Sequence, residues 1–116
     1  MPVAYPETHP ENWIEIRPEG LYCKPGGFFV DPVRPVDRAV ITHGHADHAR
    51  PGHRSALATA ETLAIMGVRY GDEPGRQAVG YGETVTENGV EICFHPAGHV
   101  LGSAQVKLSY RGASIV

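Results

Sequence analysis

The chain has 116 residues, of which 41% are hydrophobic, and its formal net charge is −3. This length and composition predict at most one small globular domain, and the charge excludes the basic stripe that holds nucleic acid by electrostatics alone. No apolar run approaches the ~20 residues of a membrane-spanning helix, and residues 1–10 lack the pattern of a secretory signal, so we expect a cytoplasmic protein without a membrane partner. Cys23 and Cys93 form no Cys-x-x-Cys pair, which favours two reduced, buried thiols.

The first forty residues are punctuated by proline and glycine, which predicts short strands separated by turns. Pro32 and Pro35 enforce an extended connection before the fourth strand. We therefore expect an extended lead-in and then a β-meander, with the lead-in over residues 1–12 and strands over residues 13–16, 21–23, 28–30 and 39–41.

One helix is predicted in the middle of the chain, directly after a short strand over residues 55–58. Thr59 can cap its first turn, where Glu61 is favourably placed against the helix dipole. We expect its apolar face to consist of Leu63, Met66 and Val68, and its end to fall at Gly67 or Gly71.

The second half of the chain predicts further strands, over residues 77–79, 84–86, 90–95, 104–110 and 113–116. The pair Asn88-Gly89 is a strong hairpin signal, and Arg111-Gly112 predicts a second tight turn. Because no helix separates most strands, we expect largely antiparallel sheets, with one face covered by the helix. The last strand would stop opposite a longer partner, so we expect residues 13–116 to be the N-terminal part of a larger, truncated domain.

The run His43-Gly44-His45-Ala46-Asp47-His48 is the main chemical feature of the sequence. Imidazole and carboxylate groups are the ligands that zinc-like ions bind. Alternate residues at a strand end share a face, so His43 and His45 can point the same way, while the small residues between them allow Asp47 and His48 to point into an adjacent position. The run therefore predicts two neighbouring metal ions.

A second chemical stretch, residues 95–103, joins two alternating strands and is longer than a hairpin needs. Its His99 is the natural third ligand beside His43 and His45, which leaves a fourth position open, as in catalytic zinc sites. We expect His95 to be structural or solvent-facing, and His53 to be a surface residue or a support for the ligands rather than a ligand.

These motifs resemble those of a known enzyme superfamily. His43 through His48 resembles the H-x-H-x-D-H signature of the metallo-β-lactamase superfamily, and residues 97–104 resemble the next motif of its β-CASP nuclease branch. More narrowly, the segments over residues 20–23, 29–32, 38–43 and 95–105 are similar to the bacterial ligase-associated DNA exonucleases, also labelled messenger-RNA 3′-end processing factors.

The resemblance implies an α+β fold, the metallo-β-lactamase αββα sandwich, of which this chain would be the first half. It implies that His43, His45 and His99 bind one zinc, and that Asp47 and His48 bind a second, with manganese as an alternative metal. Asp47 would also act in catalysis by orienting the attacking hydroxide. Asp31 would orient the histidine loop by hydrogen bonding.

The implied activity is phosphodiester hydrolysis of DNA, or of RNA, in DNA repair or RNA processing, with a DNA ligase as a further partner. The family's bridging aspartate, its last metal histidine and its inserted β-CASP domain would lie beyond Val116, so activity of this stretch alone stays open. Two alternatives remain, a hydrolase of a small thioester, lactam or lactone and a non-catalytic zinc-binding module. The sequence does not separate DNA from RNA or exonuclease from endonuclease.

Overall fold

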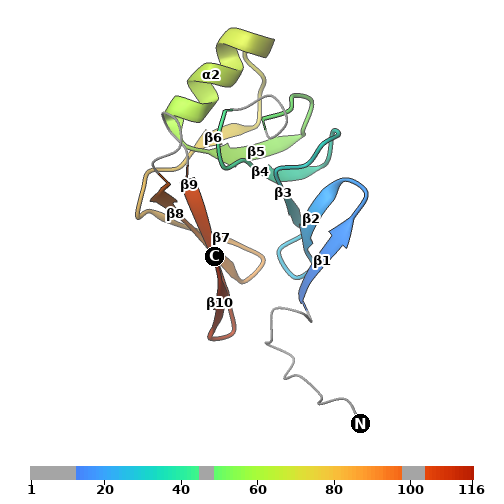
Figure 1. Ribbon diagram of the computed structural model, residues 1–116, viewed down its shortest axis with the longest axis vertical. Coiled ribbons are helices and arrows are strands. Elements are labelled where there is room, and N and C mark those ends of the chain that lie inside the picture. The colour runs from blue at the N-terminus through green and yellow to red at the C-terminus, as the bar shows by residue number, and fades with distance from the viewer. Residues whose placement is uncertain (1–12, 45–48, 98–103) are drawn as a thin grey trace.

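The structure is a computed structural model that describes residues 13–44, 49–97 and 104–116. This part of the chain forms two β-sheets that pack face to face, with one helix on the outer face of the first sheet (Figure 1). The elements are β1 (Ile14–Arg17), β2 (Gly20–Cys23), β3 (Phe28–Val30), β4 (Arg38–Val40), β5 (Ser55–Ala58), α2 (Ala60–Tyr70), β6 (Arg76–Ala78), β7 (Thr84–Glu87), β8 (Val90–Pro96), β9 (Ala104–Tyr110) and β10 (Ala113–Ile115).

The first sheet has the strand order β1-β2-β3-β4-β5-β6 and is mixed. Strands β1 to β3 pair antiparallel, as the predicted meander requires, but β4 pairs parallel with both β3 and β5, and β5 pairs parallel with β6. The prediction of a meander continuing into the fourth strand, and of largely antiparallel pairing in this sheet, is therefore wrong for β4 to β6. A strand of three residues is only about 10 Å long, so the extended connection over residues 31–37 returns the chain to the start of β4 without a helix.

The second sheet is antiparallel throughout, with the order β10-β9-β8-β7. Its hairpins lie where the sequence predicts them. Asn88 and Gly89 have φ angles of 50° and 83°, and Arg111 and Gly112 have φ angles of 49° and 83°, the positive values that two-residue turns of this kind need. The Asn88 side chain also donates to the Gly26 carbonyl (2.9 Å), which ties this hairpin to the first sheet.

Helix α2 begins and ends at residues that the sequence marks. Thr59 accepts a hydrogen bond from the Thr62 N–H as N-cap, and the Gly71 N–H, at the C-cap, donates to Gly67. Met66 is buried in a cluster with small residues of β4 and β5, namely Ala39, Ala56 and Ala58, so the helix covers this half of the first sheet. The prediction that Val68 belongs to the buried face of the helix is wrong, because 92% of its surface is exposed. No helix in the described ranges is long and apolar enough to cross a bilayer.

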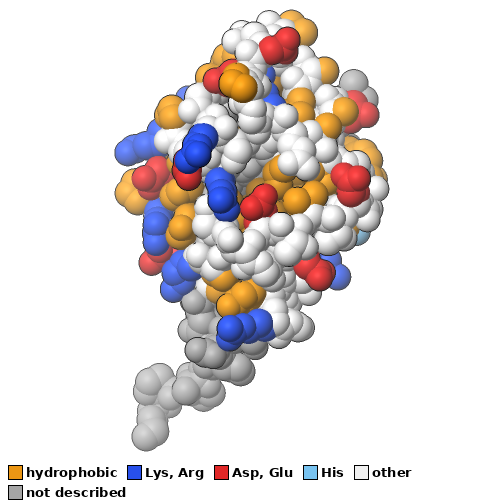
Figure 2. Space-filling view, turned by 180° about the vertical axis from the view of Figure 1, so that it is seen from behind, with side chains coloured by type: hydrophobic (Ala, Val, Ile, Leu, Met, Phe, Trp, Pro, Cys, Tyr) orange, Lys and Arg blue, Asp and Glu red, His pale blue; other side chains and the backbone are white. Residues whose placement is uncertain are grey.

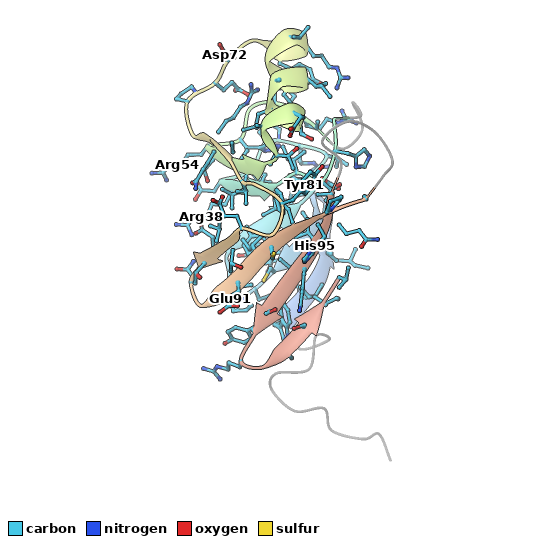
Figure 3. All side chains as sticks on the ribbon, turned by 90° about the vertical axis from the view of Figure 1, so that its left-hand side faces the viewer. Arg38, Arg54, Asp72, Tyr81, Glu91 and His95 are labelled. Atoms are coloured by element: carbon cyan, nitrogen blue, oxygen red, sulfur yellow. The ribbon has the colours of Figure 1, made fainter. Side chains whose placement is uncertain are left out.

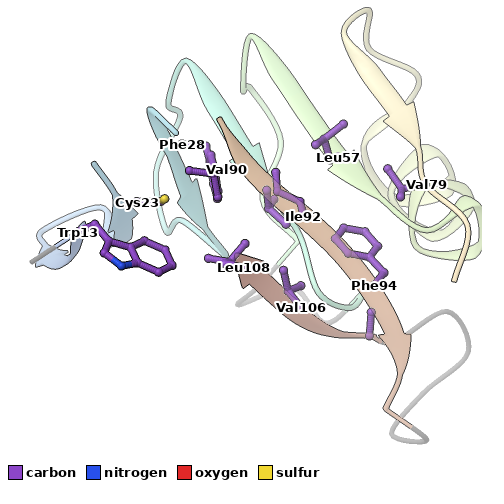
Figure 4. Close-up of a cluster of buried hydrophobic side chains, with 12 residues drawn as sticks. Trp13, Cys23, Phe28, Leu57, Val79, Val90, Ile92, Phe94, Val106 and Leu108 are labelled. Carbon is purple, nitrogen blue, oxygen red and sulfur yellow. The ribbon is translucent and has the colours of Figure 1, made fainter. Parts of the chain in front are cut away.

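The main core lies between the two sheets (Figure 4). Val90, Ile92 and Phe94 alternate along β8 with more exposed residues, as predicted, and all three are fully buried. They pack with residues of the facing sheet, including Trp13, Cys23, Phe28, Leu57 and Val79. Both cysteines are free, Cys23 being buried and Cys93 half-buried.

Candidate metal centre

The first predicted ligand, His43, lies just beyond the end of a central strand. Strand β4 ends at Val40, and the Ile41 N–H continues the pairing by donating to the Leu57 carbonyl (2.8 Å). Thr42 and His43 follow, both half-buried. The histidine is thus held at the end of the first sheet that is formed by the carboxyl ends of the parallel strands β3 and β4.

A chain of hydrogen bonds joins Asp31, Thr42 and His43. Asp31 Oδ1 accepts from the Thr42 N–H (2.8 Å), Asp31 Oδ2 accepts from the Thr42 hydroxyl (2.6 Å), and Thr42 Oγ1 lies 2.8 Å from His43 Nδ1. Asp31 reaches this position because it follows β3 directly with a φ of 47°, a left-handed conformation that aspartate tolerates better than most residues. Its own N–H donates to the Val40 carbonyl (2.9 Å), which fixes the turn against β4.

The direction of these bonds defines the tautomer of His43. A hydroxyl has one hydrogen, and the Thr42 hydroxyl donates it to the carboxylate of Asp31. Thr42 Oγ1 must then accept from His43 Nδ1–H. The lone pair of the ring consequently lies on Nε2, which is the form in which an imidazole binds a metal ion while its other nitrogen donates to a neighbour. The chemistry of His43 therefore fits the predicted zinc ligand.

The residues that flank the second histidine segment lie at the same end of the first sheet as His43. The Ala104 N–H, at the start of β9, donates to the Thr42 carbonyl (2.7 Å). Ala97, which follows β8, and Ala104 both border a cavity that Thr42 and His43 also line. The two flanking residues of the segment over residues 98–103 are thus placed beside His43, although His99 itself lies outside the described residues.

This cavity has a volume of about 470 Å³ and opens between the two sheets beside His43. Its walls are mostly aliphatic, with Thr42, His43 and Gln105 as the polar residues, and with Ile14, Leu21, Val30, Ala97, Ala104, Val106, Leu108, Ile115 and Val116 as the remaining lining. Its size falls in the range of small-molecule sites.

The other predicted metal ligands, namely His45, Asp47, His48 and His99, lie outside the described residues. Among residues 13–44, 49–97 and 104–116, no group of three or more His, Cys, Asp or Glu side chains could hold a metal ion. The ligand set therefore stays a prediction. Sequence reasoning overlooked Thr42, whose only signal was its place directly before the first histidine.

The segment after the histidine run is anchored by Glu73, in the connection between α2 and β6. Both oxygens of Glu73 accept from the Gly52 N–H (3.1 and 3.2 Å), and Arg76 donates to Oε1 of the same carboxylate (2.7 Å). The hydrogen bond from the Gly52 N–H is the main cause that holds the pKa of Glu73 below its usual value; burial opposes it, and the charge of Arg76 adds a smaller lowering effect. This carboxylate is therefore an ionised anchor for the backbone at Gly52.

His53 is buried, with 7% of its surface exposed, which excludes the first of its two predicted positions, the surface, and leaves the second, a supporting residue. Its Nδ1 accepts from the Val36 N–H (3.1 Å), which fixes the loop after the histidine run to the connection between β3 and β4. Burial lowers the pKa of His53, the neighbouring Glu73 opposing the shift. His53 thus acts as a neutral support for this loop. His95 is exposed on the polar face of β8, as predicted (Figure 3).

Charged side chains are mixed on the surface. On the face shown in Figure 2, lysine and arginine side chains are interspersed with acidic ones. This distribution agrees with the net charge of −3. Nucleic-acid binding by this part of the chain would accordingly depend on the chemistry of a site rather than on a broad basic surface.

Two curated proteins have similar sequences. A probable DNA ligase of Opitutus terrae is 34% identical over 94 residues, which cover 78% of this chain and 9% of the ligase. A ribonuclease of Thermus thermophilus is 30% identical over 118 residues, which cover 79% of this chain and 27% of the ribonuclease. The chain matches no model of a known protein family.

The chain thus spans less than a third of either relative. Both relatives are named as enzymes that act on nucleic acids, one as a DNA ligase and one as a ribonuclease. The similarity therefore indicates a nuclease-like relationship with nucleic-acid enzymes.

Proposed function

We propose that the chain is part of a metal-dependent phosphodiesterase that cleaves DNA or RNA, built on a metallo-β-lactamase-type αββα sandwich. The observation that carries the proposal is the Asp31–Thr42–His43 chain of hydrogen bonds, which presents a histidine in its metal-binding tautomer at the sheet edge. The helix, sheet and sheet layers are compatible with half of such a sandwich. The two relatives support a nucleic-acid substrate.

His43, His45 and His99 would hold one zinc ion, and Asp47 with His48 the second. When bound, such a pair of ions supplies hydroxide near neutral pH and stabilises negative charge on a phosphate group. Asp31 holds Thr42, and Thr42 holds the imidazole of His43. Asp47 would orient the attacking water for in-line displacement at phosphorus.

The similarity to a probable DNA ligase supports DNA as the substrate and strand repair as the setting, with the ligase activity supplied by the same or a partner protein. The similarity to a ribonuclease supports RNA as a second substrate. We place DNA first because the longer resemblance of the motifs is to ligase-associated exonucleases.

The test combines elemental analysis with cleavage assays. The intact protein that contains this chain is purified and incubated with end-labelled DNA and RNA oligonucleotides of one sequence, with zinc or manganese and again with a chelator. We expect bound zinc, chelator-sensitive products, and loss of zinc in His45→Ala. His95→Ala removes an exposed histidine and should change neither. Zinc retained in His45→Ala, or cleavage that resists the chelator, would refute the proposal.

The cavity beside His43 favours a second candidate, hydrolysis of a small carbonyl compound such as a thioester, lactam or lactone. Its aliphatic walls suit an acyl chain better than a phosphodiester backbone. The same preparation assayed on such esters and lactams separates the two, since only this candidate predicts turnover there. Bound zinc without turnover of any substrate would indicate a non-catalytic zinc-binding module.

A further inference from the structure

Helix α2 and the connection that follows it contact the two ends of the segment from Gly44 to Gly52. At the first end, Arg69 Nη1 donates to the Gly44 carbonyl (2.7 Å). At the other end, the Gly52 N–H donates to the Glu73 carboxylate (3.1 and 3.2 Å). Two residues only four positions apart in sequence therefore hold the two ends of a segment that contains three of the predicted ligands.

Each contact is itself supported. A Cβ on the buried Gly44 would lie 3.0 Å from two carbons of Ile65, so the helix packs directly on the backbone that Arg69 contacts. Arg76, whose side chain is only 9% exposed, binds the Glu73 carboxylate (2.7 Å) and the Gly71 carbonyl (2.8 Å). Both ends are therefore tied to a packed and hydrogen-bonded part of the fold.

We propose that Arg69 and Glu73 are positioning residues that pre-organise the histidine run for metal binding. The proposal rests on the metal site of the proposed function. A loop whose ends are fixed loses less conformational entropy when its side chains converge on an ion than a loop with loose ends. The affinity for the ion consequently depends on two residues that do not bind it.

The test measures zinc affinity by competition with a chelating dye, in Arg69→Met and Glu73→Gln. Each variant should bind zinc about tenfold more weakly, the smaller loss seen when supports of metal ligands are removed. Arg69→Lys retains a donor and should recover part of the affinity. Arg54→Met is the matched control, because among residues 13–44, 49–97 and 104–116 the Arg54 side chain pairs with Asp37 alone, at 3.4 Å, and it is 83% exposed (Figure 3).

A second readout needs no metal. Amide hydrogen exchange of the zinc-free chain should accelerate over residues 44–54 in Arg69→Met and Glu73→Gln, and remain unchanged in β8. Far-ultraviolet circular dichroism identifies any variant that fails to fold, and Arg69→Lys then supplies the comparison. Unchanged zinc affinity in both variants overturns the proposal, and so does unchanged exchange.

The two hypotheses fail differently. If the unaltered chain binds no zinc, the metal site is refuted together with the positioning of metal ligands, whatever the exchange shows. If the chain binds zinc and cleaves nucleic acid but Arg69→Met and Glu73→Gln bind zinc normally, only the positioning role is refuted.

Discussion

Asp31→Asn tests the hydrogen-bond chain through a change of one atom. Asparagine tolerates the left-handed conformation at this position, where φ is 47°. Its carbonyl can still accept from the Thr42 N–H. Its NH₂ group, however, replaces the oxygen that accepts from the Thr42 hydroxyl, and an amide nitrogen can only donate. The hydroxyl of Thr42 should therefore accept from Asn and donate to His43 Nδ1.

That reversal changes the tautomer of His43. When Nδ1 accepts a hydrogen bond, the proton of the neutral ring lies on Nε2, and the lone pair needed for a metal ion is no longer there. We expect zinc affinity to fall by about 10- to 100-fold, which corresponds to about 1.4 to 2.7 kcal/mol. Asp31 accepts two hydrogen bonds, and a bond to a charged acceptor exceeds a neutral one by about 1 kcal/mol, so the site should lose about 2 kcal/mol of unfolding free energy.

The assay is zinc competition, paired with urea unfolding of the zinc-free chain. Asp37→Asn is the control, because within the described part of the chain the Asp37 carboxylate makes one ion pair, at 3.4 Å to Arg54, and the side chain is 68% exposed. Thr42→Val should match Asp31→Asn, since it removes the linking hydroxyl, whereas Thr42→Ser should bind zinc normally. Normal zinc affinity in both Asp31→Asn and Thr42→Val would show that the tautomer of His43 is not controlled from Asp31.

Three further predictions concern stability. Because burial holds the folded-state pKa of His53 below its ordinary 6.5, the unfolded chain takes up the proton first as the pH falls. The contribution of neutral His53 to the free energy of unfolding is complete above pH 6.5 and is lost as the pH falls through the folded-state pKa. His53→Asn should therefore flatten the pH dependence of urea unfolding in this range. Parallel curves for the variant and the unaltered chain would contradict this. Gly75→Ala should lower the free energy of unfolding by about 2 kcal/mol or more, since φ is +85° and a Cβ would lie 2.1 Å from the Arg54 carbonyl oxygen. Gly89→Ala, where φ is +83° and nothing lies near the added Cβ, should lower it by about 1 kcal/mol. Equal melting points for the two variants would disprove the clash at Gly75. Phe94→Ala, at a side chain with no exposed surface, should cost about 3 to 5 kcal/mol by denaturant unfolding, and a loss below 1 kcal/mol would be inconsistent with the core in Figure 4.

The elements with local signals could be predicted from the sequence. Thr59 and Gly71 bound helix α2 because a side-chain acceptor and a residue with φ of 81° satisfy the helix ends wherever the helix packs. The Asn88-Gly89 hairpin likewise depends only on the conformations of its own residues. Alternation along β8 predicted its buried face correctly, because period 2 reports directly which side chains face a core.

Features that depend on contacts between distant parts of the chain could not be predicted from the sequence. The parallel pairing of β4 with β3 depends on how a short connection returns, which no residue pattern encodes. The bond between Asp31 and Thr42 follows from that pairing, so the role of Thr42 could not be foreseen either. Val68 lies two residues after Met66, which is about 200° around a helix of 3.6 residues per turn, so it faces away from the sheet that buries Met66 and stays exposed. The role predicted for Asp31 itself stays a prediction until its variants are measured.

The contact between Trp13 and Tyr110 allows tryptophan fluorescence to report on the packing of the two sheets. Trp13 is the single tryptophan of the sequence, is 2% exposed, and lies 5.7 Å from the Tyr110 ring, with one residue on each side of the core. It precedes β1 opposite the start of β3, whereas His43 lies beyond the ends of β3 and β4, so the two occupy opposite ends of the sheets. Emission excited at the red edge of tryptophan absorption should therefore follow separation of the sheets while remaining insensitive to zinc. A variant that loses the metal but keeps this emission has altered the histidine run and not the fold.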